Sequence, residues 1–308
     1  MKKSSILLPL ALLPALCAAE ETPAQGELYA KLNVDGQYSD EGDGGFTEIR
    51  SNNSWIGVKG TLPVEEGITA VYRLEWKVDI TAEDGDESLT ERPQYVGIRT
   101  GYGEVTLGRN FTAVWMAQGK IDLYNHYEGD IKTIWKGENR LSDVATITTP
   151  SYRDARLIIT YQAEKEADGD SAVSAGLFYG DQSLKKSRLF AAVAHDFDVE
   201  GFDVTRASVQ FKLAGGKLGF MAQTQEPADG QGDSRSGSLV SYAYPIGKWE
   251  LRGQLQTMEK DTTSNLGVDY HFGKRTKVFA WYANIDREDA DQRSYFAVGF
   301  EHKLSKFF

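Results

Sequence analysis

The sequence predicts an all-β protein, a 16-stranded antiparallel transmembrane β-barrel. About sixteen short segments alternate polar and apolar side chains, and the chain ends on two phenylalanines. Between residues 70 and 78, Arg73, Glu75 and Lys77 alternate with apolar neighbours. Successive strand side chains point to opposite faces, so this strand has one charged face and one apolar face. Segments of roughly ten residues with this pattern are typical of barrels that meet lipid outside and water inside.

Residues 1–19 explain how such a chain would reach a membrane outside the cytoplasm. Alternation alone would also fit a soluble β-sandwich, so this segment helps to decide. It combines Lys2 and Lys3, an apolar stretch over residues 6–16 and small residues before Glu20, as secretory signal peptides do. The apolar stretch is shorter than the ~20 residues that a membrane-spanning helix needs. We expect residues 1–19 to be cleaved and residues 20–308 to form one barrel domain.

Composition excludes several other functions. Removing residues 1–19 takes away two lysines and the single cysteine, Cys17, and leaves 32 basic against 45 acidic residues, a net charge of −13. The mature chain then has no disulfide or thiol chemistry. An acidic chain without basic clusters argues against nucleic acid as a partner. Cys17 as a lipid-acylation site is the alternative, although Pro14 and Leu16 do not suit that motif.

In each segment the polar residues occupy every second position, and these positions predict which side chains line the lumen. The clearest sets are Glu27, Lys31, Asn33, Asp35 and Gln37; Arg206, Ser208, Gln210 and Lys212; Glu250, Arg252, Gln254 and Gln256; Asp269 and His271; and Glu301 and Lys303. From Lys277 to Ile285 both parities are largely apolar. The pattern therefore does not decide which side of Phe279 and Trp281 faces lipid.

The links between segments alternate in length and charge. Long acidic links are expected at residues 40–45, 82–87, 164–170, 226–233 and 286–291, and tight turns at residues 100–103, 214–217, 244–248 and 271–275. Barrels of this kind have short turns on the periplasmic side and longer loops outside. An even strand count then leaves both termini on the periplasmic side.

Six short pieces occur in an order and spacing that resembles the general porins of Gram-negative bacteria, in particular those of Neisseria and related β-proteobacteria. They are WIGVKG at 55–60, AVYRLE at 70–75, YVGI at 95–98, VTLGR at 105–109, GKRTKVFA at 273–280 and FAVGF at 296–300, together with the final Phe308. The resemblance implies a homotrimer in the Gram-negative outer membrane, with passive diffusion of small hydrophilic solutes and ions through a water-filled channel. The alternative is a substrate-selective or loop-plugged barrel with a structural or adhesive role.

In that family the loop after the fifth strand folds inward and narrows the pore. The resemblance assigns this constriction loop to residues 110–142, the longest strand-free stretch of the chain. Long loops in compact folds are usually functional. By family analogy its acids would face bases on the inner wall. The predicted constriction residues are the acids Asp122, Glu128 and Asp130, the wall bases Lys59, Arg73 and Lys77, and Arg109 and Arg140 at the two ends of the loop.

Two further arginines, Arg50 and Arg92, have the wrong parity for the lumen unless a bulge intervenes. The family commonly places an arginine in the sixth strand, where this chain has DVATI at 143–147, so one wall base is missing. Opposed fixed charges in a narrow channel orient water and bias ion passage. Net charge does not predict the direction of that bias, because most acids are in the outer links.

No enzymatic, metal or cofactor site is predicted. A phospholipase built on a barrel would need a serine and a histidine fixed together near the membrane boundary, and the sequence shows no such spacing. The four histidines, His126, His195, His271 and His302, share no metal-binding spacing. Of these, only His126 is in the predicted constriction loop.

Overall fold

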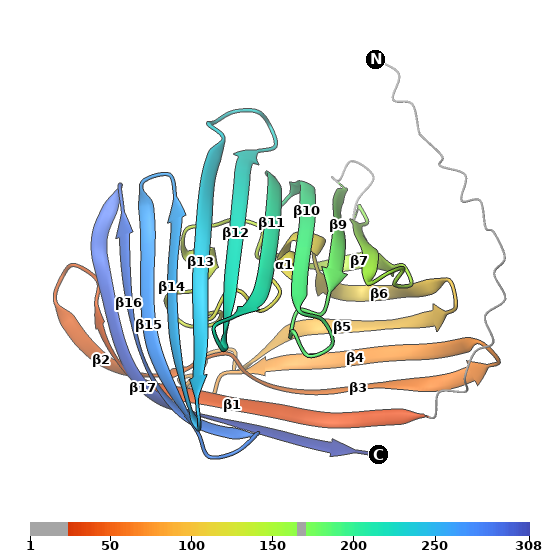
Figure 1. Ribbon diagram of the computed structural model, residues 1–308, viewed down its shortest axis with the longest axis horizontal. Helices are drawn as coiled ribbons and strands as arrows, with labels where there is room; N and C mark the ends of the chain where they lie inside the picture. Colours follow the sequence, from red (N-terminus) through yellow and green to blue (C-terminus); the bar gives the residue numbers. More distant parts are fainter. Residues whose placement is uncertain (1–23, 165–170) are drawn as a thin grey trace.

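The computed structural model describes residues 24–164 and 171–308; the expected signal peptide and the acidic link at residues 165–170 lie outside the described residues. The strands form one antiparallel sheet that closes on itself, because β1 pairs with β17 (Figure 1). The strands are β1 (Gln25–Asp40), β2 (Gly45–Ser51), β3 (Ser54–Glu65), β4 (Ile68–Val78), β5 (Leu89–Thr100), β6 (Gly103–Phe111), β7 (Arg140–Thr148), β8 (Ala155–Gln162), β9 (Ala172–Gly180), β10 (Leu189–Val199), β11 (Phe202–Leu213), β12 (Gly216–Pro227), β13 (Arg235–Ile246), β14 (Trp249–Met258), β15 (Asp261–His271), β16 (Thr276–Arg287) and β17 (Ala290–Phe307).

Two of these segments, β2 and β3, are parts of one barrel strand. Both pair with β1, β2 along its second half and β3 along its first. The interruption falls at Asn52 and Asn53, and Asn53 has a φ of 55°, a left-handed conformation that asparagine tolerates better than most residues. The barrel therefore has 16 strands, which confirms the predicted fold.

Burial follows the predicted alternation. In β4, Glu75 is 0% exposed, whereas the adjacent Leu74 is 38% exposed and points outward. The polar parities of β1, β11 and β14 are likewise on the buried, inner side. The apolar parities make up the outer face, which is the face that meets hydrocarbon in a membrane barrel. No helix among the described residues is long and apolar enough to span a membrane.

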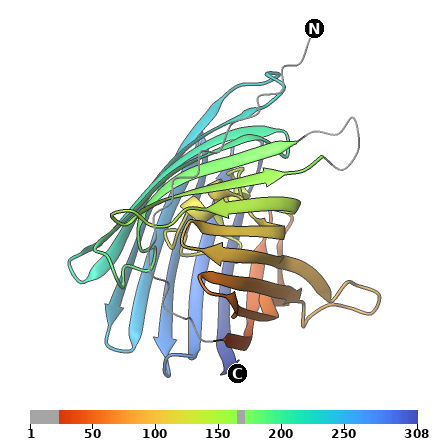
Figure 2. The ribbon, with the colours of Figure 1, turned by 90° about the vertical axis from the view of Figure 1, so that its right-hand side faces the viewer.

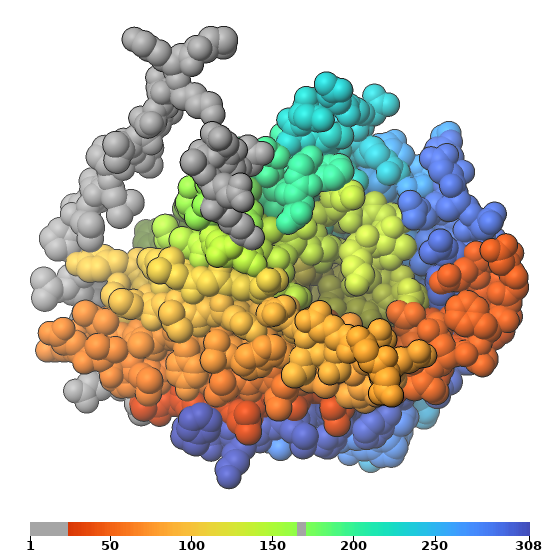
Figure 3. All heavy atoms as spheres, turned by 180° about the vertical axis from the view of Figure 1, so that it is seen from behind, coloured from red at the N-terminus to blue at the C-terminus, as the bar shows by residue number. Residues whose placement is uncertain are grey.

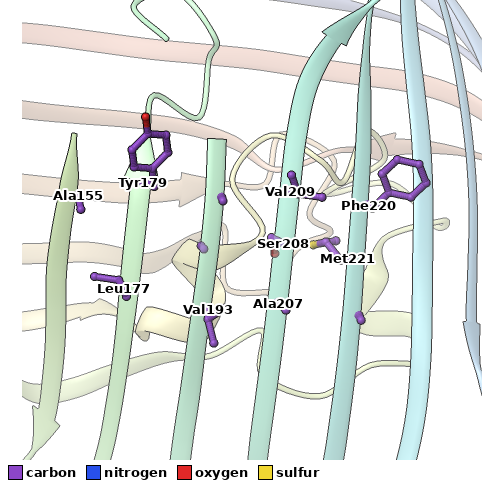
Figure 4. A pocket seen from close by; sticks show the side chains of 12 residues that line it. Ala155, Leu177, Tyr179, Val193, Ala207, Ser208, Val209, Phe220 and Met221 are labelled. Carbon is purple, nitrogen blue, oxygen red and sulfur yellow. The ribbon is translucent and has the colours of Figure 1, made fainter. Parts of the chain in front are cut away.

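The outer face has a hollow over β8–β12. It measures about 480 Å³, and Figure 4 shows it from outside, with the inner segments behind the strands. Small side chains form its floor, including Ala191, Ala207 and Ala222, and the larger Leu177 and Phe220 stand beside them. Its lining is almost wholly apolar, as expected for a surface in contact with lipid.

The link lengths differ from the prediction at one end of the barrel. β16 and β17 are joined only through Glu288 and Asp289, because the pairing of Arg287 with Ala290 continues both strands almost to the tip. The expected long link at residues 286–291 is therefore wrong. The acidic residues there are strand residues and a tight connection instead.

Residues 112–139, called the inner loop below, lie inside the barrel. Figures 1 and 2 show this yellow-green segment, with the short helix α1 (Ala113–Ala117), within the ring of strands. In Figure 3 its yellow-green atoms lie between the orange N-terminal strands and the blue C-terminal strands. Ala113, Ile121, Tyr124 and Ile131 are 0% exposed, so much of the loop is a packed core rather than a surface loop.

Candidate functional site: the constriction

The inner loop is built from two short helical turns. Thr112 caps α1, and its Oγ1 accepts a hydrogen bond from the backbone N of Trp115 at 3.1 Å. Asp130 caps a 3-10 turn, η1 (Ile131–Thr133), and accepts from the backbone N of Lys132. Side-chain oxygens at these positions satisfy backbone N–H groups that a helix start leaves free. β6 and β7 extend into the predicted loop at both ends, so its strand-free part is shorter than residues 110–142.

Apolar side chains fix the loop to the lumen side of β9–β17, called the loop-bearing wall below. Ala113 and Val114 of α1 pack against Phe178, Phe190 and Val204. Further along the loop, two more clusters join it to this wall: Ile121, Ile131, Ile134 and Trp135 with Met221, Leu239 and Met258, and Tyr124 and Tyr127 with Phe279, Trp281 and Tyr295.

This packing shows which side of β16 faces the lumen, a question that the alternation pattern left open. Phe279 and Trp281 are 2% and 1% exposed and face the lumen. Tyr127 lies 5.4 Å from both rings, measured between ring centroids. Both parities of β16 are apolar because one side meets lipid and the other meets the loop.

Neutral amides and two arginines hold the backbone of the loop. Gln254 Oε1 accepts from Leu123 N at 2.8 Å, and Gln225 Oε1 accepts from Lys136 N at 2.9 Å. Arg206, which is 0% exposed, donates to the carbonyl oxygens of Val114 and Lys136, both at 3.2 Å. Further donors to loop carbonyls are Gln210, Gln223, Ser241, Arg252, Gln256 and Asn265. Buried backbone groups of a loop need such partners.

The lumen side of β2–β7, called the charged wall below, is different. The buried carboxylate of Glu75 is held between two arginines: Arg73 Nη2 lies 2.6 Å from Oε2, and Arg92 Nε bonds to Oε1. Arg92 reaches the lumen because the β4–β5 register slips between Leu74 and Trp76. An extra residue on one strand is a β-bulge, and it re-aims the side chains beyond it.

Arg50 also faces the lumen, because the parity changes at the Asn52–Asn53 interruption. Its Nη2 lies 2.8 Å from Glu128 Oε1, an ion pair that joins the charged wall to the inner loop. His126 makes a second such link, with Nδ1 2.6 Å from Asn53 Nδ2. The loop thus touches both walls and leaves open only part of the lumen.

In the described part of the chain, two cavities with shared lining residues lie between the loop and the charged wall. One, of about 280 Å³, includes Arg50, Lys77 and Arg140 in its lining, and the other, of about 580 Å³, includes Arg73 and Tyr95. The residues that line both cavities are Arg92, Trp115, Asn125 and His126. These shared residues mark the passage between the cavities, which we call the constriction.

The loop acids are held mainly within the loop. Asp122 accepts hydrogen bonds from the backbone N of Tyr124 and Ile131 and from Gln254 Nε2. Burial raises the pKa of Asp122, and the nearby Asp130 raises it further. Burial also raises the pKa of Asp130, which Lys132 partly offsets. Asp122 and Arg73 line the same cavity, but the ion-pair partner of Arg73 is Glu75.

The other predicted residues are spread along the charged wall. Lys77, 3.7 Å from Asp79, and Arg140 line the smaller cavity, whereas Lys59 pairs with Glu27 at 3.1 Å beside the start of β1. Arg109 lies opposite Gln94 in the pairing of β5 with β6, and its side chain points outward, as that of Leu107 does. It lines neither of the two cavities. It is therefore left out of the constriction.

Sequence reasoning missed Trp115 and the buried pair of Arg206 and Glu138. Arg206 Nη1 lies 2.6 Å from Glu138 Oε1, and the two residues are 68 positions apart. Burial raises the pKa of Glu138, and the guanidinium of Arg206 opposes that rise. Alternation placed Arg206 on the lumen side, but no local signal could give its partner. Trp115 carried no alternation signal because it is in a helical turn.

One group of side chains has metal-binding types. Ligand atoms of Glu250, Asp269 and His271 all lie within 4.8 Å of one another. Asp269, however, is already paired with Arg252 at 2.8 Å and with Lys277 at 2.7 Å. Two cations on the central carboxylate disfavour a third, so the group does not alter the expectation of a channel without a metal.

Comparison with known proteins agrees with this architecture. Residues 9–291 match the family model described as Gram-negative porin. The chain is 24% identical to the major outer membrane protein P.IB of Neisseria meningitidis serogroup A, over 99% of this chain and 100% of that protein. It is 23% identical to the P.IB protein of Neisseria sicca, with the same coverage.

Solved structures share the fold at low identity. An anion-selective porin from Comamonas acidovorans aligns with a TM-score of 0.75 and 14% identity, over 91% of this chain and 100% of that chain. OmpF of Salmonella typhi, in complex with daunomycin, aligns with a TM-score of 0.72 and 14% identity, over 91% and 97%. With a family model that covers most of its length, this chain belongs to the Gram-negative porin family and is a non-enzymatic channel of the outer membrane.

Proposed function

We propose that this porin is an open diffusion channel that prefers anions. The observation that carries the proposal is the charge of the lining. Seven basic residues line the two cavities, against four carboxylates. The bases are Arg50, Arg73, Lys77, Arg92, Lys120, Lys132 and Arg140, and the acids are Glu104, Asp122, Asp130 and Glu138.

The balance at the constriction is more positive than this count suggests. Burial raises the pKa of Asp122 to about 7, which weakens its negative charge near neutral pH, and Arg206 offsets the charge of Glu138 in a buried ion pair. Glu75, although ionised between Arg73 and Arg92, is shared by two cations. Wall charges act on an ion within a Debye length, about 8 Å at physiological salt, so these residues outweigh the acidic outer links. One fold neighbour, the Comamonas porin, is described as anion-selective.

The loop supports an open channel rather than a plug. Its apolar side chains are committed to the loop-bearing wall, and the two cavities remain between the loop and the charged wall. The plugged barrel stays the alternative. Single-channel conductance in a planar bilayer separates the two, because a plugged barrel would show no steps in KCl.

The decisive experiment for the anion preference is the reversal potential of the purified protein in a KCl gradient at low salt. We expect a chloride-over-potassium permeability ratio above one. A ratio below one would overturn the proposal and would mean that the loop carboxylates dominate the field.

We further propose that the mature chain begins after residue 19 and assembles as a homotrimer. A Vibrio cholerae outer membrane protein with the same fold, OmpT, is described in a trimer form, at a TM-score of 0.67 and 11% identity. A closed barrel has no free edges and pairs its backbone groups internally, so it resists detergent. We expect an oligomer that survives sodium dodecyl sulfate and dissociates on heating, with Glu20 at its N-terminus. A monomer on the same gel, or an intact N-terminus, would contradict this proposal.

A further inference from the structure

The constriction combines an aromatic surface with arginines. Trp115, on α1, lines both cavities together with Arg92 of the charged wall. Trp115 is only partly buried, although its neighbours Val114 and Ala117 are 0% exposed. A large, partly exposed ring therefore lies where the two cavities meet.

The Trp115 ring is held in one orientation. It stacks on Phe111 with ring centroids 3.5 Å apart and an interplanar angle of 10°. Phe111 is buried, and the guanidinium of Arg140 lies 5.0 Å from its ring centroid. Because Phe111 covers one face of Trp115, the other face is the one available to the cavities.

The arginines around this ring are also fixed. Arg92 bonds through Nε to Glu75 and through Nη1 to Asn53, and its guanidinium lies 4.7 Å from the ring of Trp55. Arg140 donates from Nη1 to the carbonyl of Glu91 at 3.0 Å. Arg140 also lines the smaller cavity, so its side chain lies beside the constriction.

We propose that the constriction is a binding site for planar aromatic carboxylates. The ring of the solute stacks on the open face of Trp115, and its carboxylate is held by Arg92 and Arg140. Stacked rings attract beyond their buried area, and a guanidinium matches the geometry of a carboxylate. Cavities of 280 and 580 Å³ are of the size that small ligands occupy. This inference rests on the proposed anion preference and adds a class of solute to it.

The test compares benzoate with cyclohexanecarboxylate, which has the same charge and nearly the same size but no aromatic face. Each is titrated against the chloride current of single channels in a planar bilayer. We expect benzoate to reach half-block at a concentration about threefold to tenfold lower, the range that an aromatic pair supplies. Trp115→Leu should bring the two concentrations together, and Trp115→Phe should preserve part of the difference.

Met116→Leu is the matched control, because Met116 is the next residue of α1, lines the same cavity and has no aromatic ring. It should leave the benzoate preference unchanged. Equal half-block by the two acids in the wild-type channel would overturn the inference, as would an unchanged preference in Trp115→Leu. If Trp115→Leu does not assemble, the wild-type comparison and Trp115→Phe still decide. The chloride-over-potassium ratio is measured separately, so failure of the anion preference is distinguishable from failure of the aromatic site.

Discussion

The two halves of the inner wall use different chemistry for different tasks. The loop-bearing wall presents amides, hydroxyls and apolar side chains to the inner loop, and its two buried arginines, Arg206 and Arg252, bond to loop carbonyls. The charged wall presents Arg73, Arg92 and Arg140 to the cavities and contacts the loop at Glu128 and His126.

The difference shows which groups suit each surface. Glutamine and asparagine can both donate to and accept from a backbone, and they do so without the desolvation cost of a charge. Charges are useful only where they remain near water and a permeating ion. A side chain that points toward the lumen therefore need not line the pore, because the loop-bearing wall packs against the inner loop instead.

The largest effect is expected at the anchor of the loop. Arg206→Met removes two bonds to loop carbonyls and leaves Glu138 buried without its cation. Breaking one side of a buried pair costs about 3–5 kcal/mol. We expect the folded band in sodium dodecyl sulfate to unfold at a lower temperature and open-channel current noise to rise.

Two variants sharpen this result. The double variant Arg206→Met/Glu138→Gln should recover part of the loss, because no unpaired carboxylate remains. Arg99→Met breaks an ion pair with Glu104 in which the arginine side chain is 52% exposed, and it should cost less than about 1 kcal/mol. Equal unfolding temperatures for Arg206→Met and the wild type would show that the remaining hydrogen bonds and apolar contacts hold the loop without this arginine.

A charged-wall variant should change selectivity rather than stability of the loop. Arg92→Gln removes a cation at the constriction, and the chloride-over-potassium permeability ratio should fall several-fold at 0.1 M salt. The shift should shrink at 1 M, where the Debye length is about 3 Å. Arg73→Gln should act in the same direction. Lys212→Gln, at the exposed end of β11 on the other wall, is the control and should leave the ratio unchanged.

The pH dependence tests the loop carboxyls. Burial raises the pKa of Asp122 and Asp130, so the folded loop holds their protons more tightly than an unfolded chain does. Their contribution favours the folded loop at low pH and is lost as pH rises toward the raised values. Protonation also removes negative charge, so chloride preference should increase from pH 8 to pH 5. Burial lowers the pKa of His126 to about 2, so that ring stays neutral over this range.

The smallest effect is expected from Asp122→Asn. Neutralising this acid removes a carboxyl from the lining of the larger cavity, so permeability should shift toward anions. The shift should be small at neutral pH and vanish near pH 5, because the carboxyl is hydrogen-bonded within the loop and its pKa is raised. A shift larger than that of Arg92→Gln would show that Asp122 remains ionised and faces the passing ion.

How much of this structure the sequence predicts depends on whether a feature arises within one strand or from contacts between residues that are distant in the sequence. Alternation in β1 and β4 predicts the inner face because it is a local property of each strand. Arg92 required a bulge, which depends on the pairing of two strands and which the alternation of polar and apolar residues does not reveal. Trp281 was ambiguous because the loop that covers it comes from residues more than a hundred positions away. The apolar anchoring of the loop was not foreseen for the same reason.

The closing pair of strands has a consequence for biogenesis. Gly26 and Phe308 exchange two backbone hydrogen bonds, of 2.9 and 3.0 Å, so the pairing of β1 with β17 continues to the end of β17. A ribosome cannot deliver this contact until β17 has been synthesised. Until then β1 and every partly formed sheet have an open edge, which invites pairing with other chains. Because β1 and β17 are the first and last strands in the order, the barrel cannot close before β17 is available.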